Sequence, residues 1–300
     1  MMTEQAIAHR RAYLALAVLS CIWGYNWVVM KGALRFCDPF IFSALRILSG
    51  SFILLMILAW KSGSIKPRNI PLLILTGLLS TGGGTGISTW ALETGGAGRT
   101  AILVYTMPFW AIMLGWPVLA ERIRSIHWAS ISLALSGLIL ILAPWHTQPN
   151  LFSSLIAIIS GLAWAGGSIM VKVLAKKEDF DLLSVTAWQM LFGAIPIGFV
   201  ALLNSQSASL LWTPSLIRAL GYNILFATVI AGLLWFYVLQ QLPTGAATLG
   251  SLATPIIGIL SAALQLSERP PFLETAGILS ILFGIALIAA FDSHYSRRQR

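Results

Sequence analysis

The sequence predicts an all-α integral membrane protein with ten transmembrane helices, built as a 5+5 inverted repeat around a central cavity. Three observations predict this fold class: an apolar composition, ten apolar segments of membrane-spanning length, and a long motif that occurs twice. Hydrophobic residues make up 57% of the 300 residues and charged residues only 10%, whereas soluble domains carry about 25% charged residues. This composition excludes a soluble globular protein.

Ten segments contain the roughly 20 predominantly apolar residues that a helix needs to cross a bilayer. The connections between them are short and leave no room for a soluble domain. In chain order, the predicted spans cover residues 11–32, 38–60, 69–92, 97–119, 125–144, 150–176, 181–204, 214–241, 245–267 and 272–291.

The distribution of positive charge predicts the orientation in the membrane. An even number of spans puts both termini on one side. Twelve Lys and Arg residues fall in the tails and loops of that side, and five fall on the opposite side. Positively charged short loops stay in the cytoplasm, so both termini are predicted to be cytoplasmic. The net charge of +9 is explained in this way and does not indicate nucleic-acid binding.

The motif that occurs twice is an apolar stretch at residues 106–123, which returns at residues 253–270, displaced by 147 residues. Each copy contains a proline, Pro108 or Pro255, and closes on a Glu-Arg pair. A proline inside a membrane helix frees a backbone carbonyl, which neighbouring helices or a wet cavity must satisfy. The two prolines are therefore predicted hinges beside a cavity.

The repeat extends over nearly the whole chain. The sequence WGYNWVVMK in span 1 corresponds to WAGGSIMVK in span 6. Because each unit has five spans, an odd number, the second unit (residues 149–300) enters from the side opposite to the first (residues 1–148). Inverted repeats of this kind are typical of transporters, whose substrate binds near the membrane midplane where the halves meet.

These features together resemble the drug/metabolite transporter superfamily. The resemblance is carried by the 5+5 repeat, the WGxxW…K start, the aromatic residues Trp90 and Tyr237, and the helix that runs from proline to Glu-Arg. The chain is most similar to the ten-helix EamA-type exporters, and among them to aromatic amino-acid exporters of the YddG type. The resemblance implies a cavity formed mainly by spans 1–4 and 6–9, and export of small metabolites from the bacterial cytoplasm across the inner membrane.

An aromatic and polar stripe on span 1 is predicted to face the interior of the bundle. Trp23 and Asn26 share one helical face, and Trp164 and Ser168 occupy the corresponding turn of span 6. In the functional interpretation, the indoles stack on an apolar or aromatic part of the substrate while Asn26 and Ser168 form hydrogen bonds. In the alternative, the stripe only packs helices together.

Charged residues near the span ends have less specific interpretations. Lys31 and Lys172 are predicted to snorkel to opposite interfaces. The pairs Glu121-Arg122 and Glu268-Arg269 lie at helix ends, where they would anchor the helix or form a contact when that side of the protein closes.

Arg46 is the most informative charge because it lies well inside span 2. A charge at that depth costs about 2.5–3.5 kcal/mol even on the permissive insertion scale, so it must face protein or water. A substrate carboxylate is a suitable partner because guanidinium binds carboxylates in a bidentate manner. The alternative is a gate or packing contact with Asp38 or Glu93.

Other polar residues complete a neutral, mildly polar lining. The run TGGGTG at residues 81–86 is predicted to allow close helix approach, with hinge bending as a second role. Trp90 and Tyr237 are predicted gates or, alternatively, interfacial belt residues. The predicted substrate-binding residues are Trp23, Asn26, Arg46, Tyr105, Trp164, Ser168, Gln189 and Ser251, and the predicted gates and hinges are Trp90, Pro108, Tyr237 and Pro255.

The sequence predicts no cofactor, no metal site and no catalytic residues. Cys21 and Cys37 form no metal-binding spacing and are predicted to be free thiols. His127 and His146 lie at opposite ends of span 5 and no acidic pair lies inside a span, so an intramembrane enzyme is the weakest alternative.

The predicted function is export of amino acids, aromatic and other neutral ones, or of similar small metabolites, by a monomer. Transport is predicted to be facilitative, because no carboxylate lies deep inside a span to couple it to protons. The alternative within transport is another substrate class, such as a nucleotide precursor, a sugar phosphate or a drug.

Overall fold

The regular structure of the chain is helical, as the apolar composition predicts. All elements in the described residues are helices, apart from one isolated bridge that pairs Cys37 with Leu210. The computed structural model describes residues 4–62, 65–120, 125–142, 150–177, 181–203, 210–241 and 253–298.

The helices follow the predicted spans closely. In the described residues, eight helical stretches are long and apolar enough to cross a membrane, and two shorter apolar helices cover residues 253–265 and 272–287. The continuous helices are α1 (Glu4–Ala33), α2 (Pro39–Ser62), α7 (Ser125–Leu142), α8 (Leu151–Ala175), α9 (Leu182–Leu203), α13 (Ala253–Gln265) and α14 (Phe272–Arg298). The chain is therefore a multi-pass membrane protein.

Two spans contain a π-helical segment in the middle. Span 3 consists of α3 (Ile70–Thr76), η1 (Gly77–Gly86) and α4 (Ile87–Thr94). Span 8 consists of α10 (Pro214–Gly221), η2 (Tyr222–Ile230) and α11 (Ala231–Gln241). A π-helix bonds residue i to residue i+5, so residues five apart stack on one face. Such segments are frequent at functional sites.

Span 4 is broken at Tyr105 and Thr106 into α5 (Ala97–Val104) and α6 (Met107–Leu119). Pro108 lies in the first turn of α6, where the missing N–H costs nothing because that group has no partner within the helix. Pro255 is likewise the third residue of α13. Pro108 therefore starts a helix rather than interrupts one, whereas the residues just before α13 lie outside the described residues.

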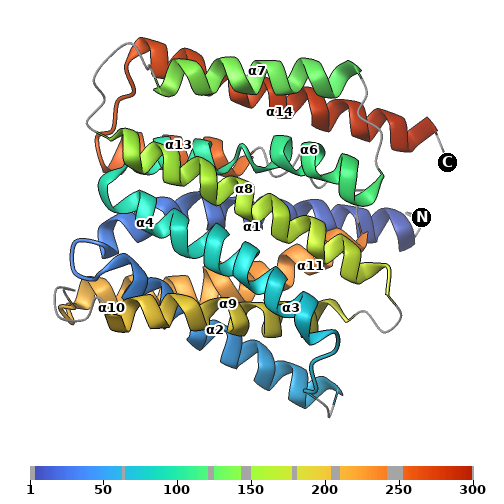
Figure 1. Cartoon of the computed structure of the whole chain (residues 1–300), viewed down its shortest axis with the longest axis vertical. Coiled ribbons are helices and arrows are strands. Elements are labelled where there is room, and N and C mark those ends of the chain that lie inside the picture. Colours follow the sequence, from blue (N-terminus) through green and yellow to red (C-terminus); the bar gives the residue numbers. More distant parts are fainter. Residues whose placement is uncertain are drawn as a thin grey trace.

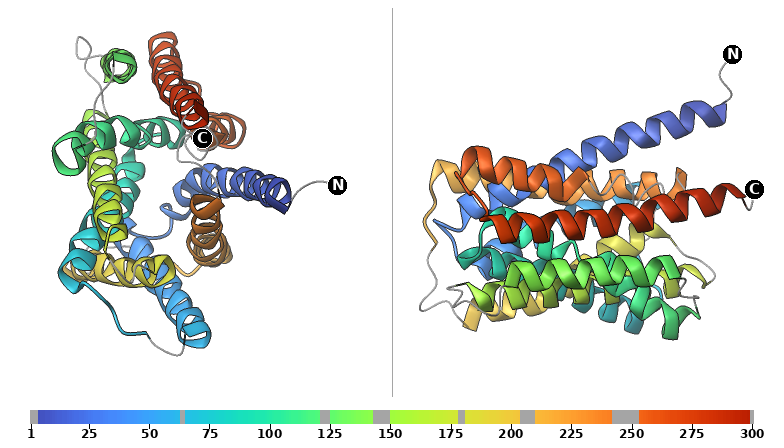
Figure 2. Two further views of the ribbon diagram at one scale, coloured as in Figure 1. Left: turned by 90° about the vertical axis from the view of Figure 1, so that its right-hand side faces the viewer. Right: turned by 90° about the horizontal axis from the view of Figure 1, so that it is seen from above.

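The helices form a bundle with α7 and α14 paired along one edge (Figures 1 and 2). Gly137 and Gly277 allow this pair to approach closely, since a Cβ on either would collide with the backbone carbonyl of the other. In the rest of the bundle, α1 packs against α11 and α13, α2 against α9, and η1 against α8 and α9. Both ends of the chain lie on one side of the bundle (Figures 1 and 2).

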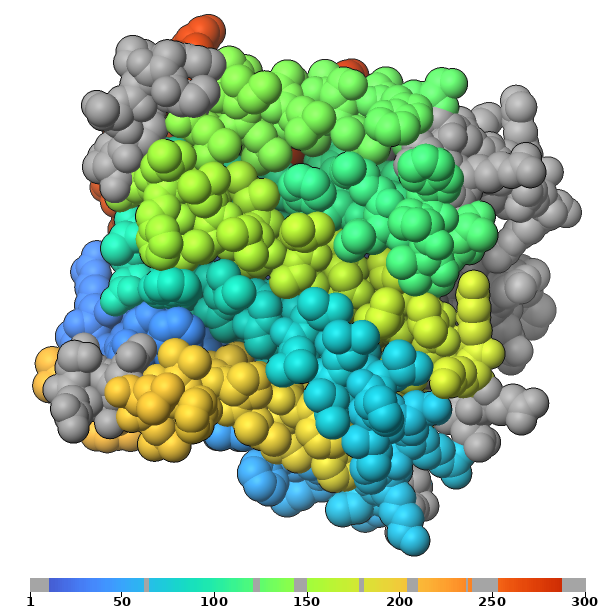
Figure 3. All heavy atoms as spheres, viewed as in Figure 1, coloured from blue at the N-terminus to red at the C-terminus, as the bar shows by residue number. Residues whose placement is uncertain are grey.

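The outer surface of the bundle is apolar, as contact with lipid requires. In the space-filling view, side chains of α7, α8, span 3 and α9 cover the near face (Figure 3). Large exposed hydrophobic side chains occur on almost every span and include Phe52, Trp60, Trp116, Trp128, Phe152, Phe199, Leu225, Leu264 and Phe283.

Candidate functional site

Arg46 of α2 is buried, with 6% of its surface exposed. Its guanidinium donates to Asn223 Oδ1 at 3.3 Å and to Thr89 Oγ1 at 3.4 Å. Both partners are neutral and both bonds are long. In the part of the chain that the structure describes, Arg46 forms no salt bridge, so neither of the carboxylates considered from the sequence, Asp38 and Glu93, is its partner.

The segment η2 packs against both α1 and α2. Tyr222 donates its hydroxyl hydrogen to Ile22 O of α1 at 2.9 Å, and Ala227 O accepts from Trp23 Nε1 of α1 at 2.9 Å. Five residues separate Tyr222 from Ala227, the spacing that a π-helix stacks on one face. The residue after Tyr222 is Asn223, which contacts Arg46 of α2. The turn of α1 that carries Trp23 and the turn of α2 that carries Arg46 therefore attach to adjacent positions of η2.

Aromatic side chains from four spans converge beside this junction. Trp23 packs against Trp235 of α11 with ring centroids 6.0 Å apart, and edge-on against Trp164 of α8 at 6.4 Å. Trp164 also contacts Tyr105, at the break in span 4, at 6.3 Å. A Cβ on Gly84 of η1 would lie 3.1 Å from Trp164 Cβ, which confirms close helix approach at the TGGGTG run. The result is an aromatic wall of Trp235, Trp23, Trp164 and Tyr105.

Buried polar atoms without partners concentrate on α1 and α2. Four buried side-chain atoms in the described residues have no hydrogen-bond partner, and three of them are Asn26 Oδ1, Ser43 Oγ and Arg46 Nε. A buried polar group left unsatisfied costs about 1–3 kcal/mol. Three such groups, on two helices that both pack against η2, therefore call for an explanation, and a polar ligand that binds there would be one.

The remaining predicted binding residues lie in different surroundings. Ser168 donates back to Trp164 O at 3.0 Å, within its own helix. Gln189 of α9 accepts from Thr81 Oγ1 of η1 at 3.0 Å, so it bridges two packed helices. Tyr105 lies beside Thr254 of α13. Ser251 lies outside the described residues.

A second polar cluster surrounds the turn between α4 and α5, at the end of the bundle that the charge distribution predicts to face outward. Lys31 Nζ donates to three carbonyl oxygens there, those of Leu92 at 2.8 Å, Glu93 at 2.9 Å and Gly95 at 2.7 Å. These carbonyls belong to the end of α4, where helical partners run out. Lys31 therefore caps the end of α4, and its snorkelling to the interface stays a prediction.

Glu268 completes this cluster from the other side. Ser267 adopts a left-handed conformation with φ of 56° and turns the chain at the end of α13. The Glu268 carboxylate then accepts from Ala97 N at 2.8 Å and from Gly98 N at 3.0 Å, the first amides of α5. A Cβ on Gly96 would lie 3.1 Å from this carboxylate. We call Lys31, Glu268 and the turn between α4 and α5 the clasp.

The predicted gates Trp90 and Tyr237 lie in the last helices of spans 3 and 8, α4 and α11. Trp90 of α4 packs between Phe40 at 5.6 Å and Phe152 at 5.3 Å. Tyr237 of α11 is partly buried against the first half of α1. Lys172 interacts with another group of the protein and is not without a partner. Glu121 lies outside the described residues.

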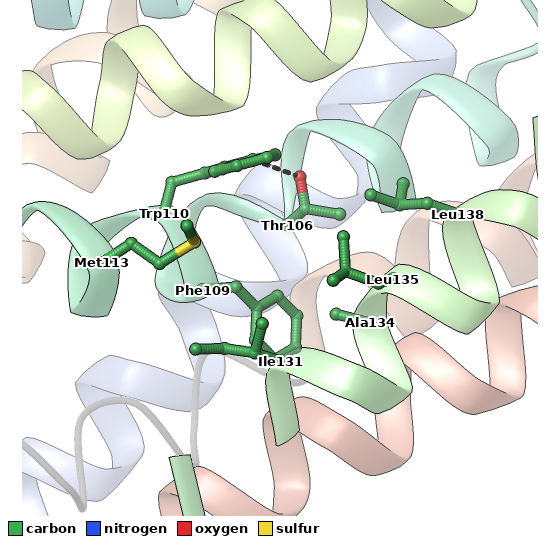
Figure 4. A pocket seen from close by; sticks show the side chains of 8 residues that line it. All are labelled: Thr106, Phe109, Trp110, Met113, Ile131, Ala134, Leu135 and Leu138. Atoms are coloured by element: carbon green, nitrogen blue, oxygen red, sulfur yellow. Dashed lines mark hydrogen bonds between the residues drawn. The ribbon is translucent and has the colours of Figure 1, made fainter. Parts of the chain in front are cut away.

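A small apolar pocket opens between α6 and α7 (Figure 4). Thr106 supplies the polar side chain of its wall, and that hydroxyl already donates to Leu103 O at 2.6 Å and accepts from Trp110 Nε1 at 3.1 Å. The pocket therefore offers no unused polar group. Its lining residues are Thr106, Phe109, Trp110, Met113, Ile131, Ala134, Leu135 and Leu138.

Sequence reasoning missed Asn223, Thr89, Trp235 and the role of Glu268 as a helix cap. The sequence did carry a signal for Asn223, because it is an amide inside an otherwise apolar span. The structure buries it completely. The other three had no signal in the sequence alone. Among the described residues, no group of three His, Cys, Asp or Glu side chains could hold a metal ion.

Comparison with known proteins decides the family. The profile of the EamA-like transporter family matches residues 10–143 and again residues 151–290. The chain belongs to the EamA-like transporter family. The two matched ranges together cover most of the sequence. Transporters of this family move small-molecule substrates across a lipid bilayer.

Relatives of this EamA-like chain are named as transporters. The uncharacterized transporter YoaV of Bacillus subtilis is 28% identical over 92% of this chain and 95% of its own. Probable amino-acid metabolite efflux pumps of Escherichia coli and Salmonella typhimurium are 26% and 27% identical over 93% of this chain and 94% of theirs. These names indicate transporters rather than enzymes, and they support a role in export.

A solved structure shares the fold. A chain described only as the crystal structure of a protein superimposes with a TM-score of 0.64 at 17% identity, covering 92% of this chain and 95% of that chain. The likeness shows that the helical architecture of this EamA-like protein is one already observed in a crystal.

Proposed function

We propose that this protein exports amino acids, aromatic and other neutral ones, or similar small metabolites, by alternating access between two inverted five-span units. The family match over two ranges of nearly equal length and the efflux pumps among the relatives support this proposal. The π-helical segments in spans 3 and 8, which correspond in the predicted repeat, support it further.

One observation carries the choice of a substrate with a carboxylate. Arg46 is a buried cation that donates hydrogen bonds to only two neutral oxygens in the described residues, both at more than 3.2 Å, and its Nε has no hydrogen-bond partner there. Its guanidinium also lies over the Phe42 ring, 6.0 Å from the ring centroid, which supplies no counter-charge. A guanidinium inside the membrane is stable only when it is paired or hydrogen-bonded. A substrate carboxylate would supply both the counter-charge and the missing acceptor.

The aromatic wall suits the rest of such a substrate. Indole and phenol rings offer large apolar faces on which an aromatic or aliphatic side chain packs. The proposed binding residues are Trp23, Asn26, Arg46, Tyr105, Trp164, Ser168, Gln189 and Ser251, with Trp90, Tyr237, Pro108 and Pro255 as gates and hinges.

In the proposed transport cycle, the clasp keeps one end of the bundle closed. Lys31 of α1 and Glu268, just after α13, hold the end of α4 and the start of α5 together by five hydrogen bonds. Opening this end would require those bonds to break, and the substrate would then leave on that side. We propose a monomer in the bacterial inner membrane with both termini in the cytoplasm, and transport down the substrate gradient without ion coupling.

Counterflow in proteoliposomes tests the function. Vesicles are loaded with one unlabelled amino acid, and uptake of labelled phenylalanine, leucine, glutamate and lysine is compared with uptake of a sugar phosphate and a nucleoside. Saturable counterflow of the neutral amino acids is the expected result. Counterflow of the phosphate or the nucleoside, with none for amino acids, would overturn the proposal. Efflux that rises with an imposed pH gradient would overturn its facilitative part.

A further inference from the structure

We infer that the side-chain carbonyl of Asn26 accepts a hydrogen bond from the α-ammonium group of the substrate, so that the site selects zwitterionic amino acids over deaminated carboxylates. The inference rests on the proposed function and deepens it. Arg46 by itself explains why a carboxylate binds. It does not explain how an amino acid is told apart from any other small organic acid.

The first step of the argument is the environment of Asn26. Only 6% of its surface is exposed, and its Oδ1 has no hydrogen-bond partner among the described residues. An asparagine amide in an apolar span is costly to keep unless a partner satisfies it. No packing role requires an amide here, because a leucine has nearly the same volume and no polar atoms to satisfy.

The second step is the position of Asn26 relative to Arg46. Asn26 lies one helical turn after Ile22 and Trp23, which bond to Tyr222 and Ala227 of η2. Arg46 bonds to Asn223, the residue after Tyr222. The two side chains with unpartnered atoms therefore lie on two helices, α1 and α2, that both pack against and bond to one π-helical segment, η2.

The third step is chemical complementarity. The unpartnered atom of Arg46 is an N–H donor on a cation, and the unpartnered atom of Asn26 is a carbonyl acceptor. An α-amino acid carries the matching pair on neighbouring carbons, an anionic acceptor and a cationic donor. In this arrangement the carboxylate forms an ion pair with Arg46, and the ammonium group donates to the neutral carbonyl oxygen of Asn26.

The test measures how well three compounds inhibit counterflow of labelled L-phenylalanine: L-phenylalanine itself, 3-phenylpropionate, which lacks the ammonium, and 2-phenylethylamine, which lacks the carboxylate. The preference of each protein is the ratio of two inhibition constants, which does not depend on how much of the protein is active. Wild type is expected to prefer phenylalanine over 3-phenylpropionate by about tenfold or more, the range for a hydrogen bond to a charged group.

The matched variants are Asn26→Ala and Asn26→Ser, which differ by one oxygen. Asn26→Ala is expected to lose most of the preference, whereas Asn26→Ser retains part of it because its hydroxyl still accepts. Asn26→Asp is expected to keep phenylalanine and to improve inhibition by 2-phenylethylamine, since a carboxylate attracts ammonium.

Several outcomes would contradict the inference. An unchanged ratio in Asn26→Ala would remove Asn26 from recognition. Loss of phenylalanine by Asn26→Asp, while Asn26→Ser retains it, would show that the amide presents its NH₂ group to the carboxylate instead. Folded but inactive protein in all three variants, monodisperse on size-exclusion chromatography, would assign Asn26 to packing. If wild type carries no amino acid, the proposed function fails first, and the two failures are thereby distinguished.

Discussion

Lys31 and Arg46 are two cations on consecutive membrane helices, α1 and α2, and their hydrogen bonding differs sharply. Lys31 donates three hydrogen bonds of 2.7–2.9 Å to carbonyls at a helix end. Arg46, with more donors, forms two long bonds to neutral oxygens and leaves Nε without a partner in the described residues. A satisfied cation stabilises the fold that surrounds it. An unsatisfied cation costs stability, and that cost is understandable if a ligand relieves it.

The largest expected effect is therefore that of removing Arg46. Arg46→Met should reduce counterflow of neutral amino acids by about tenfold to a hundredfold, the range for hydrogen bonds to a charged group. It should also raise the thermal unfolding temperature, because a buried charge without a counter-charge is lost and its apolar stem is kept. Counterflow and thermal melting of the purified protein measure the two effects.

Lys31→Met is the matched control for this prediction. It leaves three carbonyls at the end of α4 without their donor, and each such group costs about 1–3 kcal/mol. Its unfolding temperature should therefore fall. A lower unfolding temperature for Arg46→Met than for Lys31→Met would contradict the distinction between the two cations.

The next effect concerns the aromatic wall. Trp164 contacts both Trp23 and Tyr105 through its ring. Trp164→Ala removes the central ring and should slow counterflow by about tenfold, whereas Trp164→Phe keeps an aromatic face and should slow it by about threefold or less, as expected for aromatic contacts of about 0.5–1.5 kcal/mol beyond buried area.

Trp128→Ala is the control for the aromatic wall. Trp128 is a tryptophan of α7 that is 54% exposed on the lipid side of the bundle. Its removal should leave counterflow unchanged. Equal losses in Trp128→Ala and Trp164→Ala would place the effect in general stability and not in the wall.

The sequence predicts the helical spans and Arg46 well, and for one physical reason. The bilayer fixes the length of an apolar helix and makes an internal charge expensive, so both features appear in hydropathy alone. The helices of spans 2 to 8 accordingly lie within a few residues of their predicted ranges wherever the structure describes them, whereas α1 begins at Glu4, before the predicted start of span 1 at residue 11.

The hydrogen-bond partners of these residues, in contrast, could not be predicted from the sequence. Asn223 lies 177 residues from Arg46 in the chain, and Glu268 binds the amide of Ala97 across 171 residues. Backbone amides and carbonyls have no signature in the sequence, so the clasp could not be predicted. The π-helical register is equally invisible, because it changes the hydrogen-bond spacing and not the hydropathy.

A smaller effect is expected at the clasp. Glu268→Ala removes the acceptor of two amides at the start of α5, a helix-capping loss of about 0.5–2 kcal/mol. The unfolding temperature should fall by a few degrees, and the end of the bundle that holds the clasp should open more often. Arg269→Ala, at the exposed neighbouring position, should change neither property.

The labelling rate of the Cys37 thiol measures how often the end of the bundle that holds the clasp opens. Cys37 is 1% exposed and shares an apolar cluster with Leu92 and Ala97. Burial, together with the charge of Asp38, raises the pKa of its thiol to about 12, so it reacts slowly with maleimides at pH 8. Opening lowers that pKa toward the usual value and speeds labelling. With Cys21→Ser removing the exposed thiol, Glu268→Ala should label faster than Arg269→Ala; equal rates would show that the clasp does not control access.

The smallest expected effects concern two serines. They extend the comparison of satisfied and unsatisfied polar groups from cations to neutral hydroxyls. Ser43 Oγ is buried without a partner in the described residues, whereas Ser168 Oγ donates to Trp164 O at 3.0 Å. Ser43→Ala should slow counterflow by about threefold to fivefold and raise the unfolding temperature slightly, because an unsatisfied hydroxyl is removed. Ser168 is among the proposed binding residues, but Ser168→Ala should stay within about twofold in transport, since that hydroxyl is already satisfied by its own helix and would line the site without bonding the substrate. The two variants delete the same atom type, so a larger loss in Ser168→Ala would mean that unsatisfied polar atoms do not mark the binding site of this protein.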